Sequence, residues 1–122
     1  MKINNKILIL VVSVSILSGC VSSAYNKASE INTMSGYRNF LKKYPRSEYT
    51  KQARGKIEKL FWNQIKTENT IEGYTKYIKI YLKGAYVLQA KNMLHDVYWA
   101  DAQSNADIKS YCNKQDTHLK PY

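Results

Sequence analysis

Apolar side chains recur with helical spacing between residues 37 and 44. Four of them fall at i, i+3, i+4 and i+7 and therefore share one helix face: Tyr37, Phe40, Leu41 and Tyr44. The helix should end there, because Pro45 pushes the residue before it out of the α region. The pattern predicts an amphipathic helix whose charged side chains lie in solvent.

A second apolar stripe follows this break. Ser47, with Glu48 in the next turn, predicts the cap and start of a second helix. Ala53 is small, which lets two helices approach closely. The expected buried face carries Tyr49, Ala53, Ile57, Leu60, Phe61 and Ile65. The two stripes together predict a helical hairpin.

The hairpin pattern recurs 37 residues later. Asn69 and Thr70 predict the start of the second hairpin, and Gly84 lies near its turn. A fixed period in this range is typical of stacked helical pairs, and no β-strand is required. Between Gly36 and Trp62, eight of 27 positions are identical at this shift: Gly36 and Gly73, Tyr37 and Tyr74, Lys42 and Lys79, Tyr44 and Tyr81, Tyr49 and Tyr86, Gln52 and Gln89, Ala53 and Ala90, and Trp62 and Trp99.

The register extends beyond both hairpins. Tyr25 aligns with the closing tryptophan of each hairpin, so residues 24–31 are expected to form the end of a preceding helix. A further helix is expected over residues 107–116. There Lys114 and Gln115 replace two apolar core residues, which suits a terminal helix with nothing packed outside it.

The chain begins with a short basic segment and an apolar run. Lys2 and Lys6 precede this run, which covers residues 7–17. Its 11 residues are too few to span a bilayer, which takes about 20. Leu17-Ser18-Gly19-Cys20 follows and resembles the lipobox of bacterial lipoprotein signal peptides.

The lipobox resemblance implies cleavage before Cys20 and attachment of lipid to its thiol. Two acyl chains hold a protein stably on a bilayer. Val21 follows the cysteine, and by the sorting rule of such lipoproteins this residue favours the outer membrane, with the protein facing the periplasm. The expected location is therefore a membrane surface reached through the lipid on Cys20.

The predicted fold is all-α, a short α-solenoid of two helical-hairpin repeats of period 37 with half-repeat helices at both ends. The repeats resemble the tetratricopeptide-like repeats of bacterial envelope proteins over residues 24–116, although about 34 residues is their usual period. The expected segments are a signal peptide over 1–19, a lipidated lead-in helix over 20–32, two repeats over 33–106, and a polar capping helix and tail over 107–122.

The net charge and the cysteine content limit the classes of binding partner that we expect. After removal of the leader, 17 basic and nine acidic side chains give a net charge of +8. This net charge favours an anionic lipid or wall polymer as a partner, whereas export from the cytoplasm disfavours nucleic acid. The alternative is that the basic side chains form an ordinary solvated surface. Once Cys20 is acylated, Cys112 is the remaining cysteine, and it either stays a free thiol or supports self-association through an intermolecular disulfide.

The chain offers few groups for catalysis. His95 adjoins Asp96, but neighbours on a helix point in different directions, which predicts a surface histidine. Cys112, Asp116 and His118 match no closed zinc pattern. With no Gly-rich phosphate loop and no serine elbow in the sequence, we expect no enzyme, no cofactor and no metal site.

The first helix of each unit lines the concave face in tetratricopeptide-like stacks. This resemblance implies a basic surface for a peptide or polymer, although solvated lysines are the plainer alternative. The expected function is a lipid-anchored, non-catalytic scaffold that binds another envelope protein. The alternative is an accessory or immunity-type lipoprotein whose basic face binds an anionic polymer or an incoming effector. The candidate binding residues are Arg38, Lys42, Thr75, Lys76 and Lys79.

Overall fold

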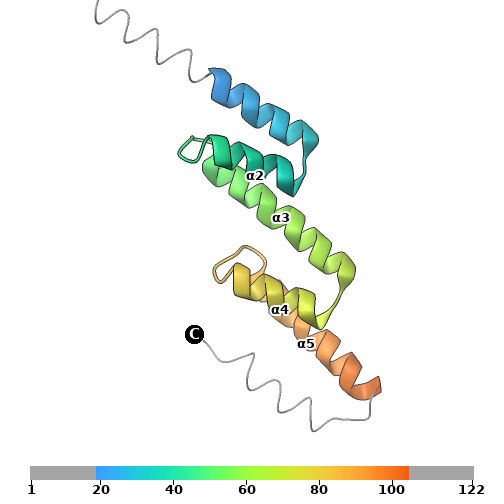
Figure 1. Cartoon of the computed structure of the whole chain (residues 1–122). Coiled ribbons are helices and arrows are strands. Elements are labelled where there is room, and N and C mark those ends of the chain that lie inside the picture. The colour runs from blue at the N-terminus through green and yellow to red at the C-terminus, as the bar shows by residue number, and fades with distance from the viewer. Residues whose placement is uncertain (1–18, 105–122) are drawn as a thin grey trace, which may run out of the picture. The chain divides into compact units, whose positions relative to one another are not determined.

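The computed structural model describes residues 19–104, and this part of the chain folds into five helices without a strand. The predicted all-α class is confirmed there. The leader up to residue 18, Cys112 and the expected capping helix lie outside the described residues. The first helix covers residues 19–31 and is followed by α2 (Met34–Lys43), α3 (Thr50–Glu68), α4 (Ile71–Ile80) and α5 (Val87–Ser104), as Figure 1 shows.

The chain divides into two compact units, the first ending at Leu60 and the second beginning at Phe61. Each unit has its own cluster of buried side chains. Ala53 and Ala90 are fully buried, as expected for small residues between closely packed helices. The first cluster holds Tyr25, Ala28, Tyr37, Phe40, Ala53 and Ile57. The second cluster holds Trp62, Ile65, Tyr74, Tyr77, Ala90 and Leu94.

Aromatic stacking organises both clusters. In the first unit, Tyr25 stacks on Tyr49 with ring centroids 4.6 Å apart and planes 15° from parallel. In the second unit, Trp62 stacks on Tyr86 at 5.4 Å and 7°. Such pairs contribute about 0.5–1.5 kcal/mol beyond the burial of their area. Each cluster therefore centres on an aromatic side chain from the helix that precedes its hairpin.

Threonine caps fix where α2 and α4 begin. The Oγ1 atoms of Thr33 and Thr70 accept hydrogen bonds from the backbone N–H groups of Gly36 and Gly73, each at 3.1 Å. A Cβ added at Gly73 would lie 2.9 Å from the Thr70 hydroxyl oxygen. Glycine at this position therefore leaves room for the cap.

An asparagine in the left-handed region precedes each capping threonine. Asn32 has φ 47° and Asn69 has φ 48°, a conformation that asparagine tolerates better than most residues. The Tyr74 hydroxyl donates to Asn69 Oδ1 at 2.7 Å, and the Tyr37 hydroxyl donates to Asn32 Oδ1 at 3.4 Å. A buried phenol is thus bonded to the turn that precedes its own helix.

The start of α3 differs from the sequence expectation. α2 ends at Lys43 with Tyr44 as its C-cap, in agreement with the proline signal. However, α3 begins at Thr50 instead of directly after Ser47. Turns fill the intervening residues, because the Tyr44 carbonyl accepts from the Ser47 N–H at 3.4 Å and from the Thr50 hydroxyl at 3.4 Å.

The asparagine–tyrosine bond makes a testable contribution to stability. Asn69→Gly preserves access to positive φ but removes the acceptor of the buried Tyr74 hydroxyl, so we expect a loss of about 1–3 kcal/mol in the free energy of unfolding. Urea denaturation measures this loss.

Two matched variants serve as controls for this prediction. Asn32→Gly should lower the free energy of unfolding by a smaller amount, because the Tyr37–Asn32 hydrogen bond is longer than the Tyr74–Asn69 bond. In the Tyr74→Phe background, Asn69→Gly should cost little, because no hydroxyl remains to be satisfied. Equal losses from Asn69→Gly with and without the Tyr74 hydroxyl would contradict the assignment.

Candidate functional site

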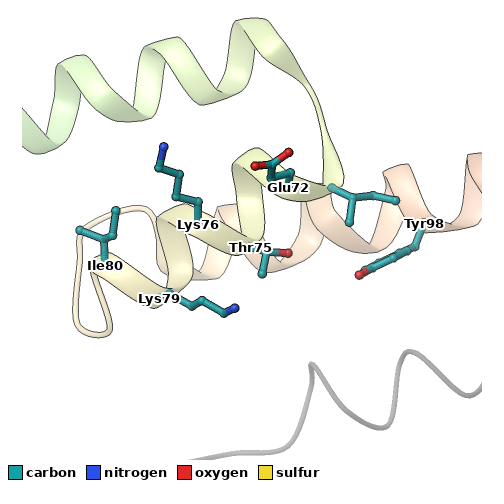
Figure 2. A pocket seen from close by; sticks show the side chains of 7 residues that line it. Glu72, Thr75, Lys76, Lys79, Ile80 and Tyr98 are labelled. Carbon is teal, nitrogen blue, oxygen red and sulfur yellow. The ribbon is translucent and has the colours of Figure 1, made fainter.

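A surface groove of about 750 Å³ runs along α4 in the second unit. Tyr74 and Tyr77 occupy the buried face of the helix, and neither of them lines the groove. Three of the five predicted binding residues line it. The lining side chains are Ile71, Glu72, Thr75, Lys76, Lys79 and Ile80 from α4, with Tyr98 from α5, as Figure 2 shows.

The charged side chains of the groove are arranged on two sides. Figure 2 shows Glu72 and Lys76 pointing to one side of α4, while Lys79 extends to the other side, along Thr75. Lys76 and Lys79 are exposed, as is Glu72. The groove therefore combines an apolar floor with a small excess of positive charge, a composition that suits an amphipathic peptide with an acidic group.

The hydroxyl of Thr75 is an unusual feature of the groove. Its Oγ1 is buried and has no hydrogen-bond partner among the residues that the structure describes. Leaving such a group unsatisfied costs about 1–3 kcal/mol. The sequence placed Thr75 among the binding candidates but gave no sign that its oxygen would be buried.

Tyr98 closes one edge of the groove. Its side chain is half-buried and packs against the second cluster. Burial raises the pKa of the Tyr98 phenol above its ordinary value. The phenol is therefore protonated at physiological pH.

The remaining predicted binding residues belong to the first unit. Arg38 and Lys42 are exposed on α2 and lie one helical turn apart, so they share a face. They do not line the α4 groove. The sequence analysis missed four lining residues: Ile71, Glu72, Ile80 and Tyr98. For the three on α4, their spacing from Thr75 and Lys79 was the available signal, whereas nothing in the sequence pointed to Tyr98 on α5.

Cys20 is an exposed free cysteine in the helix over residues 19–31. The preceding lipobox residues Leu17 and Ser18 lie outside the described part of the chain. Within residues 19–104, none of the helices has both the length and the apolarity needed to cross a bilayer.

One contact corrects a sequence expectation. His95 Nδ1 lies 3.4 Å from Asp96 Oδ1, so these neighbours do meet, contrary to the prediction from helix geometry. The contact is open to solvent, with side-chain exposures of 45% and 79%, which makes an ion pair here weak. Over residues 19–104, no three His, Cys, Asp or Glu side chains gather closely enough to hold a metal ion.

Neither a protein-family model, nor a curated protein, nor a solved structure matches the chain. The chemistry of the groove therefore follows from its own residues. It offers a protonated phenol, a buried hydroxyl, two lysines and apolar side chains on a helical support. Lysines and apolar side chains of this kind can form ion pairs and apolar contacts with a ligand.

The buried hydroxyl of Thr75 gives a prediction about stability. Thr75→Val keeps the shape of the side chain and removes the unsatisfied oxygen, so we expect the free energy of unfolding to rise by about 1 kcal/mol. Thermal and urea denaturation measure this gain.

Thr67→Val is the matched control. The Thr67 hydroxyl donates to the Asn63 carbonyl at 3.0 Å, so its removal should bring no gain. A Thr75→Val protein that is less stable than the original would show that the hydroxyl is hydrogen-bonded in solution, against the prediction.

Proposed function

We propose that the protein is a lipid-anchored envelope protein that acts as a non-catalytic scaffold for protein–protein interaction. The α4 groove carries this proposal, because it combines apolar side chains with the exposed Lys76 and Lys79 on one helix. A peptide segment of another envelope protein would supply an apolar contact and an acidic group for Lys79.

The proposal includes a finer description of the fold, as two tetratricopeptide-like repeats of period 37 with half-repeat helices at both ends. Several local contacts support it by recurring at this spacing. The φ values of Asn32 and Asn69, the caps of Thr33 and Thr70, and the fully buried Ala53 and Ala90 are examples. A rigid helical support of this kind presents a groove without rearrangement.

Lipid attachment at Cys20 is the proposed tether. The exposure of the thiol supports it, together with the lipobox sequence before it. Val21 after the cysteine favours the outer membrane as the destination, facing the periplasm. Two acyl chains would hold the protein on the bilayer while the helices remain free to bind.

The second candidate is an accessory or immunity-type lipoprotein whose basic face binds an anionic envelope polymer or an incoming effector. Arg38 and Lys42 on α2 favour it, because both side chains are exposed on one helix face. Binding of this kind depends on charge and weakens as ionic strength rises.

Metabolic labelling tests the tether. Cells that produce the protein with radiolabelled or alkyne-tagged palmitate should yield labelled protein that starts at residue 20. Cys20→Ala should abolish the label and leave the leader in place, whereas Cys112→Ala should retain the label. Unchanged labelling of the Cys20→Ala protein would remove the anchor from the proposal.

Crosslinking in intact cells, followed by mass spectrometry, separates the scaffold from the polymer binder. A scaffold should capture one protein in a fixed ratio, and Lys79→Gln should reduce its capture a few-fold, the range of an exposed ion pair. Lys59→Gln, an exposed lysine on α3 outside the groove, is the control. Absence of a protein partner, with polymer binding lost at high salt, would favour the second candidate.

A further inference from the structure

The connection between α4 and α5 presents a group of exposed apolar side chains. We call residues 80–88, from the last residue of α4 to the second residue of α5, the α4–α5 corner (Figure 1). Ile80 is 57% exposed, Leu82 67% and Leu88 74%. These three are among the most exposed large apolar side chains in residues 19–104, and they fall within nine consecutive positions.

The backbone of this corner is held in place from inside. The Gly84 N–H donates to the Tyr81 carbonyl at 3.0 Å, and the Tyr86 N–H donates to the Tyr77 hydroxyl at 3.3 Å. Tyr81, Tyr86 and Val87 pack on the second cluster. Leu82 and Leu88 alternate with these anchored residues and therefore stay in solvent on a fixed support.

The corner between α2 and α3 shows that the fold does not require these apolar residues. Its turn is closed by the same pattern, with Ser47 N–H donating to the Tyr44 carbonyl at 3.4 Å and Thr50 N–H donating to the Ser47 carbonyl at 3.1 Å. Three exposed residues hold the positions at this corner that correspond to the exposed apolar residues of the other: Lys43, Pro45 and Lys51. Apolar character is thus specific to the α4–α5 corner.

Positive charge surrounds the exposed leucines. Lys79 and Lys83 are exposed beside them, and the sequence holds no aspartate or glutamate from residue 73 to residue 95. Apolar side chains with flanking lysines and no acidic residue form the pattern of a segment that lies in the interface of an anionic membrane. A second copy of the same corner would bring lysine against lysine and is disfavoured by charge.

We propose that the α4–α5 corner docks on the surface of an anionic phospholipid bilayer. Leu82 and Leu88 enter the boundary between headgroups and acyl chains, and Lys83 lies against the phosphates. This contact goes beyond the proposed scaffold function and does not need the lipid on Cys20. It would hold the second unit at the membrane surface independently of the tether.

The test uses residues 20–122 with Cys20→Ser, so that its result is independent of lipid attachment. Cosedimentation measures binding to vesicles of equal parts phosphatidylglycerol and phosphatidylethanolamine, with phosphatidylcholine vesicles for comparison. The protein should bind the anionic vesicles. Leu82→Ser combined with Leu88→Ser should weaken binding at least about tenfold, and Lys83→Gln about fivefold.

Ile31→Ser is the matched control, because Ile31 is 53% exposed but lies outside the corner. It should leave vesicle binding unchanged, and circular dichroism should show the same helix content for every variant. In a Leu88→Trp protein, anionic vesicles should shift the added indole fluorescence to shorter wavelength, which adsorption by charge alone would not do.

Three results would overturn the proposal. The first is absence of binding to anionic vesicles, and the second is binding that the double leucine variant leaves intact. The third is self-association that depends on Leu82 and Leu88 without vesicle binding, which analytical ultracentrifugation would detect and which would assign the corner to a second copy. Failure of palmitate labelling at Cys20 would leave each of these results interpretable.

Discussion

The burial of one aromatic side chain against the hairpin that follows it is the contact on which each unit depends. Tyr25 supplies it in the first unit and Trp62 in the second, where the indole is 1% exposed. Aromatic residues bury about 150–250 Å² each, which corresponds to about 4–6 kcal/mol of transfer free energy. Short helices of ten residues, such as α2 and α4, are marginal alone and need this packing.

Tyrosines link this packing to the turns. A phenol buried in the core must satisfy its hydroxyl, and in the second unit both principal tyrosines do so at chain reversals. Tyr74 donates to Asn69 before α4, and Tyr77 accepts from the backbone of Tyr86 before α5. Burial raises the pKa of Tyr74, so its hydroxyl remains a protonated donor at physiological pH. Core and turn geometry are therefore specified together.

The sequence predicted the parts of the fold that depend on local rules. The apolar stripes, the proline after Tyr44 and the Thr70 start signal are short-range patterns, and the helices follow them. The predicted start of α3 was wrong, because hydrogen bonds to the Tyr44 carbonyl replace a cap at Ser47. The asparagine–tyrosine bonds were missed because they combine a turn conformation with a side chain five residues away.

The candidate site was predictable to a smaller extent. Thr75 and Lys79 lie one helical turn apart on α4 and share a helix face, and this much follows from spacing. Whether a side chain on that face meets solvent, a groove or the core depends on α5, which supplies Tyr98 from a distant part of the sequence. Periodicity predicts which residues share a helix face. It does not predict which of those residues a neighbouring helix covers.

One element serves both cores. α3 runs without interruption from Thr50 to Glu68, and its first half contributes Ala53 and Ile57 to one cluster while its second half contributes Trp62 and Ile65 to the other (Figure 1). The boundary between the units therefore falls inside a helix and not in a linker. Neither half is a detachable module, because excising one would strip the other of a run of backbone hydrogen bonds. Loss of either unit would therefore remove part of a helix that both clusters share.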